Sequence, residues 1–285
     1  MSALPKSDPN HALNQLLAKA DDIAVLPHVV FRVLDVTGDA DLQSTGLEHA
    51  IITDPGFSAK VLTLANSAYY DLPKKVASVK EALLFLGFKS VRNLAMTNGA
   101  YDMFVGKNDE DSLRRRSWWR HSVDTASCAR WIARRVDGVS ADEAYTCGLL
   151  HIYGKTMLDR LGEGSYTECS HLIDQGTDVR EAEQKVFGCD HVEVVVGAAR
   201  KWGCPESLVQ GLRYLDPPGA KEEFRLERAT TAMASSIAHL ARIGHKRDAQ
   251  AIPDWSLEVL GIPADHAESA VEEGIAEITA AQLNL

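Results

Sequence analysis

The sequence predicts an all-α fold with two helical lobes. Apolar residues recur at helical spacing along most of the chain, and these runs begin at capping residues and end at glycines. No segment sustains the polar and apolar alternation of a half-buried strand, and the nearest candidate, residues 75–79, is short. We expect an N-terminal lobe over residues 12–108 and a second lobe over about 117–243. Residues 1–11 are expected to be disordered, and residues 244–285 to form C-terminal helices packed on the second lobe.

The helices of the first lobe are predicted from their starting residues. Asp54 followed by Pro55 fits an N-cap and a first helical position. Ser78 and Glu81 have the spacing of a capping box, in which the serine oxygen accepts from the Glu81 amide and the carboxylate reaches back. The helix that they open is expected to end at Gly87.

Two long helices are predicted at the start of the second lobe. Ser117 precedes an amphipathic run that continues to about Val136. Ser140 and Glu143 form a second capping box, and we expect one helix from there through Leu161.

Shorter helices follow with the same pattern of caps. One is expected to end at Gly176, one to run from Asp178 to Gly188, and one from Asp190 to Gly203, because glycine adopts the left-handed conformation that ends a helix. Further helices are expected over about residues 205–215, 224–243, 255–260 and 264–282.

Composition and charge exclude several classes of protein. The chain has 285 residues, with Lys+Arg 30 against Asp+Glu 40 and a formal net charge of −10. This balance disfavours a protein that clamps a nucleic-acid backbone over a broad surface, although it leaves room for a small anion pocket. No apolar stretch approaches the roughly 18 residues that a membrane-spanning helix needs, and the N-terminus lacks the apolar core of a secretory signal. We therefore expect a cytoplasmic protein with no membrane partner.

Cysteines and basic runs favour structural roles. The five cysteines include no Cys-x-x-Cys pair, so we expect neither a disulfide framework nor a zinc ribbon. The basic run over residues 114–116 is interpreted as a solvated helix face, and Arg134 and Arg135 fit the cation preference of a helix C-terminus. A regulator that touches nucleic acid is the weakest hypothesis, because it would need a contiguous positive patch.

Histidines provide the candidate site. The chain has 10 histidines, and His121, His151 and His191 all fall within predicted helices. A buried histidine among leucines needs a hydrogen-bond partner or a metal. Lys155 lies four residues after His151 and is expected on the same helix face, so the two could flank one pocket. With Asp124, one turn after His121, these residues form our candidate pocket.

The order of several motifs resembles known families. The motifs Trp119-Arg120-His121-Ser122, Gly148-Leu149-Leu150-His151, Gly154-Lys155, Phe187-Gly188 and Asp190-His191 are similar to those of the HD phosphohydrolase superfamily. The upstream motifs Leu26-Pro27, Asp54-Pro55, Leu64-Ala65-Asn66-Ser67, Ser78-Val79, Leu86-Gly87 and Val91-Arg92-Asn93-Leu94 resemble the HDOD domain, the HD-related output domain of bacterial signalling proteins. The resemblance spans about residues 18–216, and we assign residues 12–216 to this domain, with residues 117–243 as its HD-like lobe.

The chain departs from the catalytic HD pattern at one position. In catalytic members a His-Asp dyad holds a divalent metal, but here Ile152 follows His151. A hydrolytic metal centre needs anionic oxygen to hold a hard cation and to generate hydroxide from bound water. A later helix likewise has Ser235-Ser236 where the resemblance would place an aspartate. The resemblance therefore implies a degenerate branch with no catalytic residue, no metal and no cofactor.

One metal alternative remains open. Three histidines with a fourth open position are a known zinc arrangement, and such a site needs outer carboxylates that orient the imidazoles. Asp124 and Asp190 are the acids close enough in sequence to His121 and His191 for that task.

The resemblance implies a non-enzymatic module for signal transduction that binds a protein partner or a small ligand. We expect the binding site in a cleft between the lobes, lined by the histidines, with a shift in lobe arrangement on binding. The alternative is a metal-dependent phosphohydrolase or phosphodiesterase of the HD superfamily that acts on a nucleotide or cyclic dinucleotide. It would use His121, His151 and His191, with Lys155 as the phosphate contact.

Overall fold

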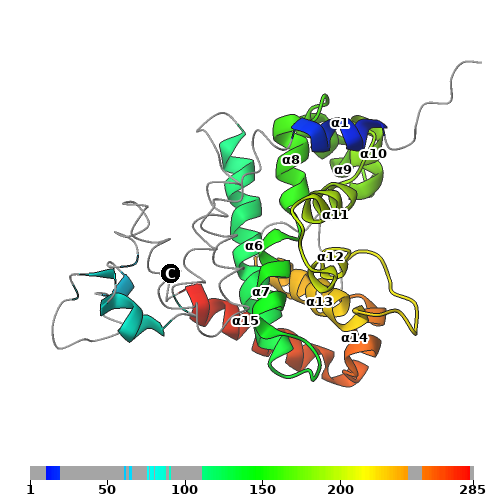
Figure 1. Ribbon diagram of the computed structural model, residues 1–285. Coiled ribbons are helices and arrows are strands. Elements are labelled where there is room, and N and C mark those ends of the chain that lie inside the picture. The colour runs from blue at the N-terminus through cyan, green and yellow to red at the C-terminus, as the bar shows by residue number, and fades with distance from the viewer. Residues whose placement is uncertain are drawn as a thin grey trace, which may run out of the picture. The chain divides into compact units, whose positions relative to one another are not determined.

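The structure is a computed structural model of the chain (Figure 1). The residues that it describes are 11–19, 61, 64–65, 76, 78–79, 81–87, 90, 111–242 and 252–282. Every regular element in these ranges is a helix, so the predicted all-α class is confirmed there. No helix within the same ranges is both long enough and apolar enough to cross a membrane.

The chain divides into two compact units. Apart from the last two residues, one unit comprises residues 24–108 and the other comprises residues 1–23 and 109–283. In the first unit, the Glu81 amide donates to Ser78 Oγ at 3.2 Å, and Gly87 has a left-handed φ of 70°. The serine half of the predicted capping box is therefore confirmed, and the left-handed φ of Gly87 fits the predicted helix end. The helix predicted to start at Asp54 lies mostly outside the described residues.

The larger unit contains most of the described helices. In chain order they are α1 (His11–Lys19), α6 (Ser112–Ala133), α7 (Ala141–Leu150), α8 (Tyr153–Leu161), α9 (Tyr166–Asp174), α10 (Val179–Phe187), α11 (His191–Lys201), α12 (Glu206–Gly211), α13 (Arg225–Ala241), α14 (Asp254–Leu260), the 3₁₀ turn η2 (Ala264–His266) and α15 (Ala267–Gln282). Asp178 and Asp190 cap α10 and α11 as predicted, the latter within a full capping box. The expected helix over residues 205–215 is shorter, because α12 ends at Gly211.

Helix α6 begins earlier than predicted, at Ser112 rather than after Ser117. Its first turns are held by ion pairs, since Arg114 and Arg115 contact the two carboxylate oxygens of Asp159 in α8 at 2.8 and 2.7 Å. The Arg115 side chain is only 3% exposed. The interpretation of the basic run as a solvated face was therefore wrong for Arg115, whereas Arg116 is exposed.

The single helix predicted through Leu161 is interrupted at His151 and Ile152, where α7 ends and α8 begins. Ile152 has φ −105° and ψ 10°, outside the helical region. Two glycines explain the break. A Cβ on Gly148 would lie 2.7 Å from the Ala126 Cα of α6, and a Cβ on Gly154 would collide with the backbone carbonyl of His191. The chain changes direction at residues 151–152, where α7 lies against α6 and α8 against α11.

Helix α1 packs on α8 and α11 of the larger unit. The Lys201 ammonium donates to the Leu17 carbonyl at 2.8 Å, and Lys19 pairs with Glu163 at 3.3 Å. This arrangement differs from the expected lobe boundary, which placed residues 12–108 together.

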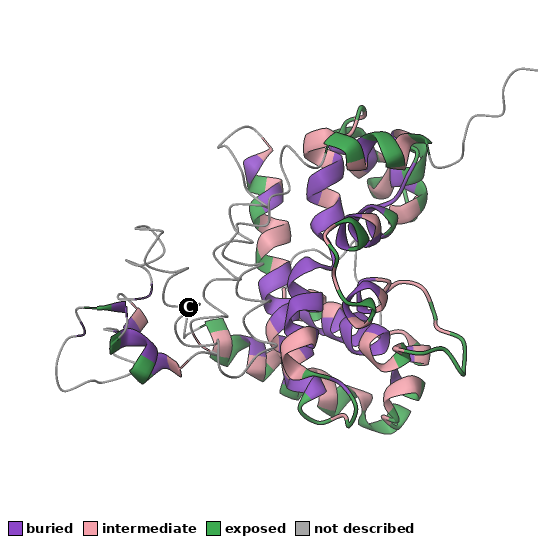
Figure 2. Ribbon diagram, viewed as in Figure 1, coloured by how far each residue is buried: buried purple, intermediate pink, exposed green. Residues whose placement is uncertain are grey.

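The core of the larger unit lies between α6, α7 and α13 (Figure 2). Helices α14 and α15 pack on α13, and α15 also packs on α6. Buried apolar side chains of this core include Ile132 of α6, Ile237 of α13 and Ile278 of α15, which are each at most 2% exposed. The C-terminal helices thus complete the core of this unit.

Candidate functional site

His151 lies immediately after α7 and is fully buried. Its Nδ1 is 2.7 Å from the Gly148 carbonyl oxygen, so Nδ1–H is the donor of that bond. Its Nε2 is 3.0 Å from Ser235 Oγ on α13. Both ring nitrogens of His151 are therefore engaged by the protein itself.

Ser235 also bridges His151 to His121 of α6. The His121 Nε2 lies 3.2 Å from the same Oγ, and the two ring centroids are 5.2 Å apart. Because His151 has its proton on Nδ1, its Nε2 accepts from the Ser235 hydroxyl, and the Ser235 oxygen accepts from Nε2–H of His121. The hydrogen-bond network assigns these tautomers.

This arrangement fits two neutral imidazoles. Burial lowers the pKa of His151 to about 3, although its hydrogen bond to the Gly148 carbonyl acts in the opposite direction. Burial also holds the pKa of His121 well below its usual value, and the neighbouring His151, Arg242 and Lys155 lower it further. Neither ring is charged near neutral pH.

His191 is bound in a second set of hydrogen bonds. Its Nδ1 donates to Glu183 Oε2 at 2.6 Å, its backbone amide donates to the same oxygen at 2.9 Å, and its Nε2 is 3.0 Å from the Tyr214 hydroxyl. The other Glu183 oxygen accepts from the Tyr166 hydroxyl at 2.6 Å. Both His191 and Glu183 have fully buried side chains.

The charge on Glu183 is stabilised despite its burial. Burial by itself raises the pKa of this carboxyl, but the charge and hydrogen bond of His191, together with Lys155 and Tyr166, lower it to about 2. Glu183 is therefore an ionised carboxylate at neutral pH, with its two oxygens shared among three donors.

Tyr214 joins the two sets of bonds. Its ring centroid is 4.8 Å from that of His151, and its hydroxyl reaches His191. The structure thus brings the three predicted histidines into one connected group. We call it the imidazole cluster, and its members are His121, His151, His191, Ser235, Tyr214 and Glu183.

The two aspartates do not orient the imidazoles. Asp124 is buried, and its Oδ1 accepts from the Gln282 side chain of α15 at 2.8 Å. Burial raises the pKa of Asp124. Asp190 caps α11 and pairs with Arg180 at 2.7 Å. These two acids, the candidates for outer partners under the metal alternative, thus contact other residues, and Glu183 is the carboxylate that orients His191.

Lys155 stands at the edge of the cluster. It lies in α8 and is partly exposed. Its positive charge lowers the pKa values of His121, His151 and Glu183, so its ammonium is within electrostatic reach of all three. Within the ranges that the structure describes, this ammonium forms neither a hydrogen bond nor an ion pair.

Three members of the cluster were not predicted from the sequence as hydrogen-bond partners of the histidines: Glu183, Tyr214 and Ser235. Glu183 had a usable signal, because it lies four residues after Val179 and four before Phe187, on the apolar face of α10. An acid at such a position requires a buried partner. Tyr214 and Ser235 had no comparable local signal, since their partners are distant in the sequence.

The donors of the cluster do not fit a divalent metal. Buried Ile152 offers no oxygen, and both nitrogens of His151 and of His191 already have protein partners. Among the described residues, no group of three His, Cys, Asp or Glu side chains has an arrangement that could hold a metal ion.

The fold and this site define an all-helical domain with HD-like histidine positions. A family model for the HDOD domain matches residues 23–218. The chain therefore belongs to the HDOD domain family, which confirms the resemblance found in its motifs.

Known proteins support this assignment. The chain is 25% identical over 224 residues to an uncharacterized protein of Treponema pallidum (strain Nichols), covering 76% of this chain but only 42% of that protein. Among solved structures, an HDOD domain protein of Geobacter sulfurreducens is similar at 22% identity, with a TM-score of 0.70 and coverage of 95% and 98% of the two chains. A Shewanella amazonensis SB2B protein named for a proposed phosphohydrolase activity is 25% identical, with a TM-score of 0.66 and coverage of 94% and 98%.

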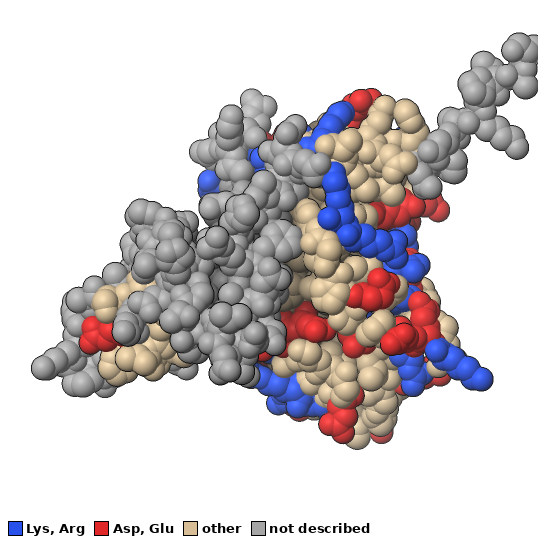
Figure 3. Space-filling model, in the orientation of Figure 1, with Lys and Arg blue, Asp and Glu red and all other residues tan. Residues whose placement is uncertain are grey.

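Charges on the described surface are mixed. On the face shown in Figure 3, Lys and Arg side chains of the larger unit are interspersed with Asp and Glu. In the upper part of that view several Lys and Arg side chains follow one another in a band. The prediction that nucleic acid is not a partner stays a prediction.

Proposed function

We propose that this protein is a non-enzymatic regulatory module of a signalling pathway, which acts in the cytoplasm by binding a protein partner or a small ligand. One observation supports the non-enzymatic part most directly. Both ring nitrogens of His151 have protein partners, and the next residue is the buried, aliphatic Ile152. A metal centre needs lone pairs and anionic oxygen at this place.

The surface beside the cluster supports a binding role. His121, Ser235 and Lys155 are partly exposed, whereas His151 and His191 are fully buried. A partner or an anionic ligand would therefore reach the cluster through the Lys155 ammonium. The expectation that the cluster lines a cleft between lobes stays a prediction. All five cysteines are free, which fits a reducing compartment.

The non-enzymatic part is tested by metal content and turnover. Purified protein is analysed for bound metals and assayed with bis(p-nitrophenyl) phosphate and a cyclic dinucleotide, with Mn²⁺ or Fe²⁺ added. We expect no stoichiometric metal and no turnover above the buffer rate. Stoichiometric metal together with turnover that is lost in His151→Ala would instead establish the phosphohydrolase alternative, the activity for which the Shewanella protein is named.

The binding part is tested with a matched pair of lysine variants. A partner recovered by crosslinking is purified, and its affinity is measured for wild type, Lys155→Glu and Lys185→Glu. Lys185 is exposed in α10, and it is not a member of the imidazole cluster. We expect Lys155→Glu to weaken binding at least roughly tenfold, since it reverses a charge at the proposed contact. Equal affinities of the two variants would contradict this use of Lys155.

A further inference from the structure

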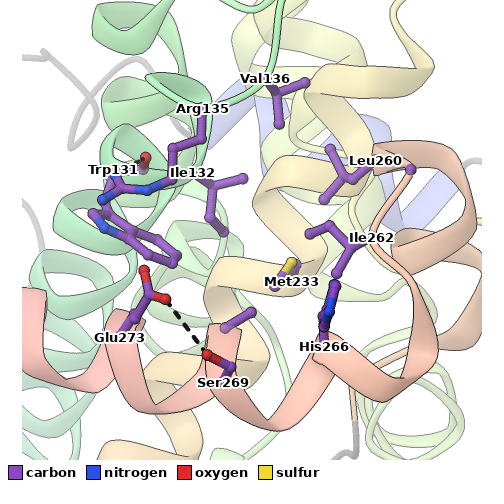
Figure 4. A pocket seen from close by; sticks show the side chains of 12 residues that line it. Trp131, Ile132, Arg135, Val136, Met233, Leu260, Ile262, His266, Ser269 and Glu273 are labelled. Atoms are coloured by element: carbon purple, nitrogen blue, oxygen red, sulfur yellow. Dashed lines mark hydrogen bonds between the residues drawn. The ribbon is translucent and has the colours of Figure 1, made fainter.

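A second region of the larger unit has the features of a ligand site. A cavity of about 490 Å³ lies between the C-terminal end of α6, the middle of α13 and the segment from α14 to α15. Figure 4 shows Trp131 and Arg135 on one wall, Ile262 and His266 on the other, and Met233 between them. Small-molecule pockets usually have volumes of roughly 300 to 1,000 Å³, so the size fits a small ligand.

The floor of this cavity is apolar and closely packed. Ile132 and Met233 are at most 2% exposed, and Trp131 is 7% exposed. Leu260 and Ile262 pack against the same core as partly buried side chains. Because Ile132 and Met233 already lie out of water, a ligand would remove apolar surface from water mainly at Leu260 and Ile262, and such removal is the usual source of affinity in pockets of this kind.

The polar groups stand at the rim and are only partly used. The Arg135 guanidinium lies 4.3 Å from the Trp131 ring centroid, and its Nη1 donates to the Trp131 carbonyl at 3.2 Å. These two contacts hold the guanidinium in place, yet most of its donors remain uncommitted and it forms no ion pair within the described ranges. The His266 ring likewise has no hydrogen bond to another described residue.

The uncommitted guanidinium at the rim favours an anion. Among the residues that line the cavity, Arg135 is the cation and Glu273 is the acid. A Glu273 oxygen already accepts from Ser269 Oγ at 3.5 Å. Because Arg135 already covers a face of the Trp131 ring, that face is closed to a cationic ligand.

We propose that this cavity binds a small ligand with an apolar, ring-sized body and one carboxylate, the body on Leu260 and Ile262 and the carboxylate on Arg135. A guanidinium fork that is already oriented pairs a carboxylate with little further loss of side-chain freedom. This site is separate from the imidazole cluster, so the proposal does not depend on the proposed function.

The test compares a charged probe with its neutral isostere. Binding of 1-naphthoate and of 1-naphthamide is measured by isothermal titration calorimetry on the full chain. We expect 1-naphthoate to bind at least roughly tenfold tighter than the amide, as a charge-assisted hydrogen bond requires. No measurable binding of either probe at millimolar concentration, or equal affinities for both, would overturn the proposal.

Variants locate the binding within the cavity. Arg135→Gln is expected to abolish the preference for the charged probe, whereas Arg134→Gln, an equally exposed neighbour that does not line the cavity, is expected to keep it. Ala270→Leu, which fills the cavity from α15, is expected to weaken both probes. Circular dichroism and thermal melting verify that each variant folds. An equal loss in Arg134→Gln and Arg135→Gln would place the charge effect outside the cavity and contradict the proposal.

Discussion

The imidazole cluster and the α6–α13–α15 cavity use the same two helices in opposite ways. Helix α6 contributes His121 to the cluster and Trp131 to the cavity. Helix α13 contributes Ser235 to the cluster and Met233 to the cavity. In the cluster, buried polar atoms bind one another. In the cavity, the buried surface is apolar and the polar groups lie at the rim, where most N–H donors of the Arg135 guanidinium have no partner among the described residues.

The difference shows how burial decides what a polar group can do. A buried donor or acceptor must find a partner during folding, and once His151 and His191 have done so they have no capacity left for a ligand. Arg135 is exposed and therefore needs no buried partner. We accordingly expect substitutions in the cluster to change stability and substitutions at the rim to change binding.

The largest effect is expected at Glu183. Glu183→Ala removes a buried carboxylate that accepts hydrogen bonds from the His191 ring, the His191 amide and the Tyr166 hydroxyl. The free energy of unfolding should fall by about 3 to 5 kcal/mol, as it does when one partner of a buried pair is removed. Urea denaturation measures this, with the exposed Glu181→Ala in the same helix as control. Similar losses in both variants would contradict the role of Glu183.

The same residue predicts a pH dependence. The pKa of Glu183 is about 2 in the folded protein against an ordinary value of 4.5. A lowered folded pKa contributes stability that is fully present above about pH 4.5 and is lost as the pH falls towards 2. The stability difference between wild type and Glu183→Gln should therefore shrink across this window. A difference that stays constant there would mean that Glu183 is not ionised in the fold.

A slightly smaller effect is expected at Gly154. An added methyl group collides with the His191 carbonyl, so α8 and α11 must separate and the cluster must shift. We expect Gly154→Ala to lower the free energy of unfolding by about 3 kcal/mol. Gly219→Ala is the matched control, since its added Cβ would have no neighbour closer than 3.9 Å. Thermal melting of both variants measures the difference. Equal melting temperatures of Gly154→Ala and Gly219→Ala would contradict the close contact between Gly154 and the His191 carbonyl.

A moderate effect is expected at Ser235. Ser235→Ala removes the hydroxyl that bridges His121 and His151, leaving one donor and one acceptor without their partner. The expected loss is about 1 to 3 kcal/mol by chemical denaturation. Ser236→Ala, the next residue of α13, removes no bond of the cluster and should lose less. Were the two losses the same, the bridge would not stabilise the fold.

The smallest effect on stability is expected at the cavity rim. Arg135→Gln alters an exposed side chain, so the free energy of unfolding should change by less than about 0.5 to 1 kcal/mol. Denaturation under the conditions used for Glu183→Ala measures the contrast directly. A large loss here would remove the distinction between a structural cluster and a binding rim.

Local signals predicted much of the fold. The caps at Asp178 and Asp190 and the left-handed Gly188 appear where the sequence placed them, because a cap involves only neighbouring residues. The break at Ile152 was missed because it depends on the close approach of Gly148 to α6 and of Gly154 to α11, which are contacts between distant segments.

The site was predicted in part for the same reason. The three histidines could be named from their helical positions, but their partners Ser235 and Tyr214 lie many residues away. Asp124 and Asp190 are close to the histidines in sequence, yet they contact Gln282 and Arg180 instead. The sequence therefore indicated which imidazoles lie close together, but it did not indicate which carboxylate contacts them.

The state of the His151 ring tests the central claim most directly. Nuclear magnetic resonance of ¹⁵N-labelled imidazoles reports tautomer, charge and metal contact for each histidine. We predict that His151 stays neutral with its proton on Nδ1 between about pH 8 and about pH 5, since burial lowers its pKa to about 3, and that one equivalent of Zn²⁺ leaves its signals unchanged. A titration of His151 near pH 6.5, or a shift of its nitrogen signals on adding Zn²⁺, would contradict the account.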